Sequence, residues 1–169
     1  MLSTRRHVLA TIGSLGAVSV AGCLVGSSDD ISENEELALV VYQEGNYVYS
    51  LGKEALSNGF DSFEQDDTDE ALDAFMQAVD RFREARSAFH EVNKILSEED
   101  KPAEEVNTAS ERATTLHTIS DDSVTAAESL LNNSENSRAE IEQLEDEFRP
   151  EERWEILTPD ELQSMFEQR

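Results

Sequence analysis

The sequence predicts an all-α fold, an antiparallel three-helix bundle (up-down-up) with one or two shorter C-terminal helices. Apolar residues recur every seven residues along three long segments. The three prolines, Pro102, Pro150 and Pro159, each fall where a helix is expected to start or stop. No segment alternates apolar and polar residues with the period of two that strands show. With 169 residues, the chain has room for one main domain around one modest core.

The first helix is expected over residues 34–65. Its predicted inward stripes comprise Val41, Val48 and Ala55, and beside them Tyr42, Tyr49, Leu56 and Phe63.

Three glycines, Gly45, Gly52 and Gly59, also lie seven residues apart on this helix, in line with Ala38. Each costs a helix interior about 1 kcal/mol relative to alanine, so their presence needs a reason. One interpretation is a smooth groove where another helix backbone approaches closely. The other is a hinge or a face that contacts a partner protein.

The second helix is expected over residues 68–96, with Asp67 or Thr68 as its N-cap. Its pattern is the clearest of the three, and its two stripes make a wide apolar face that must be buried. The face comprises Ala71, Ala78, Ala85 and Val92 beside Phe75, Phe82, Phe89 and Leu96.

Ser97 is the expected N-cap of the third helix, with Asp100 three residues on and Pro102 in the first turn. This helix is expected to break or bend at residues 132–134. A shorter helix follows, and the Thr158-Pro159-Asp160-Glu161 segment then opens a last one. The predicted inward residues are Val106, Ala109, Ala113, Leu116, Val124, Ala127 and Leu131, then Ile141, Leu144 and Phe148, and finally Leu162, Met165 and Phe166.

A tetratricopeptide-like repeat is the rival architecture, because the Ala71–Phe82 segment has a similar pattern of small and aromatic residues. The sequence holds no second copy at the repeat spacing of about 34 residues. Helices of about 30 residues are also too long for that repeat, so the bundle is preferred.

The N-terminal segment has the layout of a signal peptide. Two positive charges, Arg5 and Arg6, precede an uncharged run from Val8 to Ala21. The run has about 14 residues, fewer than the roughly 20 that a membrane-spanning helix needs.

The Thr4-Arg5-Arg6-His7-Val8-Leu9 segment resembles the twin-arginine (Tat) export signal, and Val20-Ala21-Gly22-Cys23 resembles a lipobox. Together they are similar to the signals of haloarchaeal Tat lipoproteins. The resemblance implies export through Arg5 and Arg6, cleavage before Cys23 and a lipid on the Cys23 thiol. It therefore predicts a signal peptide (1–22), a lipidated cysteine and flexible tether (23–33), and a bundle domain (34–169) on the outer face of the cell membrane.

The net charge of the chain argues against two classes of partner. It carries 38 acidic and 13 basic residues, a net charge of −25. Nucleic acids and anionic lipid surfaces would be repelled, because binding them needs clustered Lys and Arg. Cys23 is the only cysteine, so the mature domain holds no disulfide and no thiolate metal site.

Catalytic and metal-binding motifs are missing from the sequence. A di-iron bundle would need Glu three residues before His90 and His117, where Ser87 and Thr114 stand. The chain also has no Gly-framed serine and no Gly-rich phosphate loop. We therefore expect no enzyme activity, no cofactor and no metal ion.

Two further features have both a structural and a functional interpretation. Trp154 is either a lid on the bundle or a contact for a partner protein. Asn132-Asn133-Ser134 is a glycosylation sequon, which makes Asn132 a candidate site.

The sequence favours a non-enzymatic cell-surface lipoprotein whose bundle is an interaction or scaffolding module for an unidentified envelope protein. The alternative is an extracytoplasmic ligand-binding or sensing bundle, with a pocket along Phe75, Phe82 and Phe89. A filled core favours the first function, and a void lined by those rings favours the second.

The acidic residues are spread over the whole mature chain, as on the solvated surfaces of halophilic archaeal proteins. Repulsion among them acts over about 10 Å at 0.1 M salt and about 3 Å at 1 M. We predict that the fold loosens at low salt, which circular dichroism across a salt titration would show as lost helical signal. An unchanged signal would contradict adaptation to salt.

Overall fold

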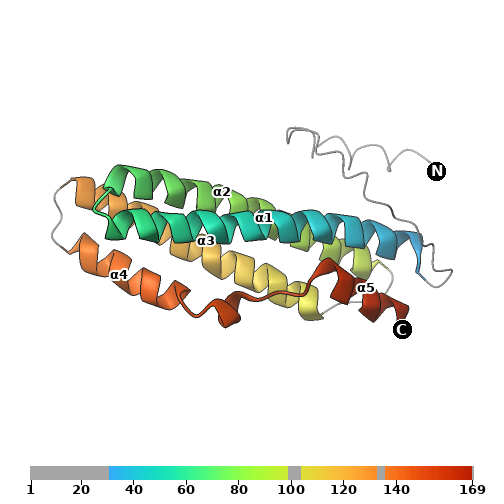
Figure 1. Cartoon of the computed structure of the whole chain (residues 1–169). Helices are drawn as coiled ribbons and strands as arrows, with labels where there is room; N and C mark the ends of the chain where they lie inside the picture. The colour runs from blue at the N-terminus through green and yellow to red at the C-terminus, as the bar shows by residue number, and fades with distance from the viewer. Residues whose placement is uncertain (1–30, 99–103, 133–135, 169) are drawn as a thin grey trace, which may run out of the picture.

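The computed structural model describes residues 31–98, 104–132 and 136–168 (Figure 1). The described part contains helices and no strand, which confirms the all-α prediction. The signal segment and Cys23 lie outside the described residues. The elements are α1 (Glu33–Glu64), α2 (Thr68–Ser97), α3 (Glu104–Leu131), α4 (Ser137–Phe148), the short 3-10 helix η2 (Glu151–Trp154) and α5 (Pro159–Glu167).

The three long helices run antiparallel, up-down-up, as predicted (Figure 1). The middle helix, α2, packs along both α1 and α3, whereas α1 and α3 scarcely touch each other. The chain after α3 runs back along the bundle, with α4 against α3 and α5 against α1 (Figure 1). This C-terminal segment covers the open side of the bundle and takes the place of a fourth helix.

Side-chain caps define where three of the helices begin. Ser32 and Glu35 form a reciprocal capping box at the start of α1, and Thr158 and Glu161 form another at the start of α5. Asp67 caps α2 by accepting a hydrogen bond from the Glu70 amide. The caps predicted at Asp67 and Thr158 are confirmed.

The turn between α1 and α2 brings these helices together as an antiparallel pair. The Asp66 amide donates to the Phe63 carbonyl and the Asp67 amide to the Ser62 carbonyl, the two bonds of a Schellman motif. Asp66 adopts a φ of 62°, where glycine is more usual. This motif lets the chain reverse within three residues.

The three glycines of α1 lie beneath phenylalanine rings of α2. A Cβ atom at Gly45, Gly52 or Gly59 would come within 2.9, 2.8 and 2.4 Å of the ring atoms of the facing phenylalanine. The facing rings belong to Phe89, Phe82 and Phe75, in that order. The predicted close approach is therefore present, but aromatic rings make it rather than a helix backbone.

Aromatic pairs extend this contact into the core. The ring centroids of Tyr49 and Phe82 are 5.7 Å apart, and those of Phe60 and Phe75 are 5.1 Å apart. Both pairs have the edge-to-face geometry that the ring quadrupoles favour. The α1–α2 interface is thus a row of rings fitted between glycines and other rings.

The inward face of α3 differs from the prediction in its second half. Val124 is only half-buried and Leu131 is 45% exposed, while Ser120 and Ser123 are buried. The seven-residue register set by Val106, Ala109, Ala113 and Leu116 continues through these serines, although they are polar. Their hydroxyls donate to the Leu116 and Ile119 carbonyls, both at 2.8 Å, so neither is buried without a partner.

The cap predicted at Ser97 is wrong. Ser97 is the last residue of α2, and its hydroxyl donates to the Asn93 carbonyl at 2.6 Å. Asp100 and Pro102 lie outside the described residues. Serine, a common N-cap residue, also occurs in the last turn of a helix, where its hydroxyl donates to a carbonyl of the preceding turn.

Gly59→Ala should lower the free energy of unfolding by up to about 2 kcal/mol. The new methyl group overpacks against Phe75 at a cost of about 1–3 kcal/mol, while the gain in helix propensity is about 1 kcal/mol. Chemical denaturation would measure the difference, with the exposed Ser57→Ala as a control expected to change little. A more stable Gly59→Ala protein would contradict the packing described above.

Candidate functional site

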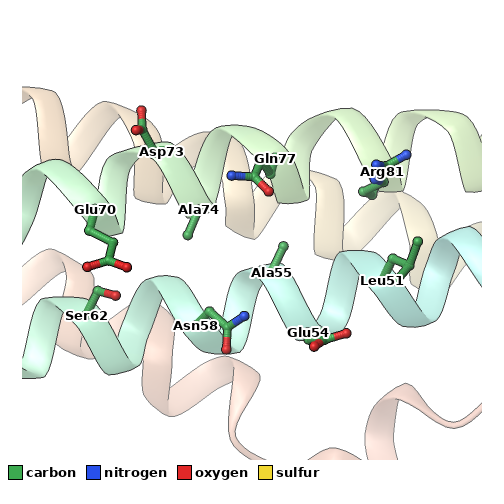
Figure 2. Close-up of a pocket in the computed structure, with 10 residues that line it drawn as sticks. All are labelled: Leu51, Glu54, Ala55, Asn58, Ser62, Glu70, Asp73, Ala74, Gln77 and Arg81. Atoms are coloured by element: carbon green, nitrogen blue, oxygen red, sulfur yellow. The ribbon is translucent and has the colours of Figure 1, made fainter.

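An open groove of about 480 Å³ runs between α1 and α2 on the outer side of the bundle (Figure 2). Ala55 of α1 and Ala74 of α2 both point into the space between the two helices (Figure 2), and their small side chains fill little of it. The lining residues are Leu51, Glu54, Ala55, Asn58 and Ser62 of α1 and Glu70, Asp73, Ala74, Gln77 and Arg81 of α2.

The lining of the groove is acidic. Glu54, Glu70 and Asp73 contribute three carboxylates, against the single guanidinium of Arg81. Arg81 is also 3.3 Å from the carboxylate of Glu84 on its own helix, which partly balances its charge. The groove therefore favours cationic groups.

An exposed row of apolar side chains continues from the groove toward the start of α1. Leu37, Val40 and Tyr47 are 43, 49 and 60% exposed, and Leu51 links them to the groove that it lines. Steps of three, seven and four residues place these four on one helix face. We call Leu37, Val40, Tyr47 and Leu51 the outer stripe.

The sequence analysis missed the outer stripe. It assigned the seven-residue repeats of α1 to buried faces, and the structure buries all of these residues except Ala55, which is half-buried and lines the groove. The signal for a second face was the separate set of large apolar residues that those stripes did not include.

The opposite side of α1 is held by the C-terminal segment through buried and partly buried hydrogen bonds. The Tyr42 hydroxyl and the Asn46 amide both donate to the Leu157 carbonyl at 2.8 Å. The Tyr49 hydroxyl donates to the Trp154 carbonyl, also at 2.8 Å. Burial raises the pKa of both tyrosines well above its ordinary range, so they stay protonated donors. We call residues 149–158 the strap.

The residues predicted to contact a partner protein are buried within the bundle. Gly45, Gly52 and Gly59 are buried under the rings of α2. Trp154 is 2% exposed, and its indole N–H donates to the Phe148 carbonyl at 2.7 Å. Trp154 thus packs as a lid, and a part for these four residues in partner contact stays a prediction.

Asn132 is exposed just after the end of α3, and its amide donates to the Glu128 carbonyl at 2.8 Å. Asn133 and Ser134 lie outside the described residues, so glycosylation of Asn132 stays a prediction.

The two histidines of the described part lie on α2 and α3. His90 is exposed and His117 is half-buried. Burial lowers the pKa of His117, and the positive charge of the nearby Arg86 lowers it further. Within residues 31–98, 104–132 and 136–168, no group of three or more His, Cys, Asp or Glu side chains is placed to hold a metal ion. The same ranges contain no helix long and apolar enough to cross a membrane.

The phenylalanine stripe of α2 is packed rather than hollow. Phe75, Phe82 and Phe89 are fully buried, and the space between them and α1 does not admit even a methyl group on the facing glycines. None of the three lines the groove of Figure 2.

The fold and groove define a class by architecture alone, an antiparallel helical bundle with an acidic surface groove. In comparisons with known proteins, no family model, curated protein or solved structure matches the chain.

Tyr49→Phe should destabilise the protein by about 1–3 kcal/mol, because it leaves the buried Trp154 carbonyl without its donor. Tyr47→Phe is the matched control, since its ring is 60% exposed. Chemical denaturation followed by Trp154 fluorescence would measure both. Equal stabilities for the two variants would contradict the role of the strap.

The pH dependence of stability supplies the second measurement for Tyr49. Its folded-state pKa is raised above the unfolded value of about 10. Its contribution is therefore fully present below about pH 10 and is lost as the pH rises from there toward the folded pKa. The parent should lose stability above pH 10 more steeply than Tyr49→Phe.

Proposed function

We propose that this chain is an exported, lipid-anchored, non-enzymatic module that binds another protein of the cell envelope. The observation that carries the proposal is the exposed outer stripe running into an acidic groove, on a bundle whose aromatic core is filled. Large apolar side chains exposed in a continuous row are typical of protein interaction surfaces.

The anchor is proposed from the resemblance of residues 4–9 and 20–23 to a Tat signal and a lipobox. Eight residues lie between Cys23 and Ser32, the N-cap of α1. Such a chain spans at most about 30 Å when fully extended. A lipid on Cys23 would therefore keep the first turns of α1 close to the membrane.

The alternative of a ligand-binding or sensing bundle needs a pocket along the phenylalanine stripe. The glycine contacts fill that position, and the open groove lies elsewhere on the surface. An open, acidic groove beside an apolar row suits a macromolecular partner better than an enclosed small molecule.

Cys23→Ser should be exported and released from the membrane, because the thiol that would carry the lipid is gone. Fractionation of cells into membrane and released protein would show this. Replacing Arg5 and Arg6 with Lys should instead retain the full-length precursor inside the cell. Cys23→Ser protein that stays on the membrane after export would contradict the anchor.

The interaction itself is tested by chemical cross-linking of the anchored chain on intact cells. A discrete adduct with another envelope protein is expected. Absence of any adduct, with export and anchoring normal, would contradict an interaction module.

A further inference from the structure

We infer that the outer stripe and the groove form one docking surface for a basic amphipathic helix of the partner protein. The inference rests on the proposed function and assigns to it a surface and a partner chemistry.

The two parts of the surface are continuous along α1. Leu51 belongs to both, and the seven-residue steps from Leu37 through Glu44 and Leu51 to Asn58 stay on one face. A helix rises about 1.5 Å per residue, so the 21 steps from Leu37 to Asn58 span about 32 Å. That length accommodates about six helical turns of a partner.

The spacing of the exposed residues points to a helix as the occupant. Leu37, Val40, Tyr47 and Leu51 present apolar groups at the spacing with which one helix packs against another. An amphipathic helix laid along them would seat its own apolar residues between these side chains and in the groove. Elsewhere in the described part, the exposed large apolar residues are Met76 and Leu131, which lie on different helices.

The charges around the surface point to a basic partner. Glu36 precedes the outer stripe in sequence and Glu44 lies within it, between Val40 and Tyr47, while Glu54, Glu70 and Asp73 line the groove. Arg81, the cation that lines the groove, is balanced within α2, where it lies 3.3 Å from Glu84. Lysine and arginine on the flanks of a docked helix would meet carboxylates along its length, which sets specificity and association rate.

The same charges disfavour two other occupants. A second copy of this chain would bring its own acidic surface, with Glu36, Glu44 and Glu54, against this one, and juxtaposed like charges oppose association. An anionic bilayer would be repelled in the same way, since the chain carries a net charge of −25.

A synthetic peptide provides a defined probe. We would use a 21-residue amphipathic helix with leucine at the two apolar positions of each heptad and lysine and alanine elsewhere, and a scrambled peptide of the same composition. Binding of the labelled peptide to the full chain is measured by fluorescence anisotropy, at a salt concentration where the chain shows its full helical signal.

Tyr47→Ala should weaken binding of the amphipathic peptide about tenfold or more, as the loss of an exposed aromatic anchor typically does. Met76→Ala is the matched control, because Met76 is 52% exposed on α2 and lies outside the surface. It should leave the affinity within about twofold of the parent. Both variants should keep the parental melting temperature.

Several results would overturn the inference. If the scrambled peptide binds as tightly as the amphipathic peptide, or if Met76→Ala loses as much affinity as Tyr47→Ala, general charge attraction would account for the binding. Tyr47-dependent binding to vesicles of phosphatidylcholine and phosphatidylglycerol would assign the surface to a membrane. Tyr47-dependent dimers in sedimentation would assign it to a second copy.

A photo-cross-linking residue placed at position 47 or at position 76 in cells separates this inference from the proposed function. Adducts from position 47 to a basic helical segment of another protein are expected. Adducts from position 76 alone would overturn the docking surface and leave the interaction module standing. Absence of adducts at both positions, together with none from chemical cross-linking of the parent, would overturn the proposed function itself.

Discussion

The contact between three glycines of α1 and three phenylalanine rings of α2 is the constraint on which the rest of the structure depends. A Cβ atom on any of these glycines would come within 3 Å of a ring, so the rings lie directly against the backbone of α1. Each glycine costs the helix about 1 kcal/mol, whereas burying a phenylalanine gains roughly 1.5–3 kcal/mol. Burial therefore outweighs the propensity cost at every one of the three positions.

That contact also decides which sides of α1 remain available. The glycine face is committed to α2, and Tyr42 and Tyr49 commit a neighbouring face to the strap. The remaining face carries the outer stripe, and the small residues Ala55 and Ala74 keep the adjoining edge of the α1–α2 interface open as the groove. The exposed surface is thus what the two buried contacts leave uncovered.

The order of the helices, the ends of α1 and α2 and the start of α5 could be predicted because apolar periodicity and capping residues are local signals, whereas the start of α3 was misplaced at Ser97. The inward face of α3 was harder, since Val124 and Leu131 are more apolar than Ser120 and Ser123. The register of the bundle outweighed apolarity there, and the serines satisfy their hydroxyls within the helix. The bonds from Tyr42 and Tyr49 to the strap span more than 100 residues of sequence, and no local pattern encodes such pairings. The groove depends on two small residues of different helices, Ala55 and Ala74, which both point into the space between α1 and α2. The sequence does not show which residues of two helices come together until the helices are paired.

Under the proposed anchoring, α1 has two roles that constrain each other. Its first turn follows the tether, and its outer stripe starts at Leu37, within the second turn after Ser32. A partner helix on this surface would therefore lie close to the membrane at one end and reach the groove about 30 Å away at the other. The strap binds another face of α1 and so limits how far α1 itself can shift relative to the rest of the bundle. A partner bound along α1 would consequently be held at a fixed orientation to the bundle, while the residues between Cys23 and Ser32 set its distance from the lipid.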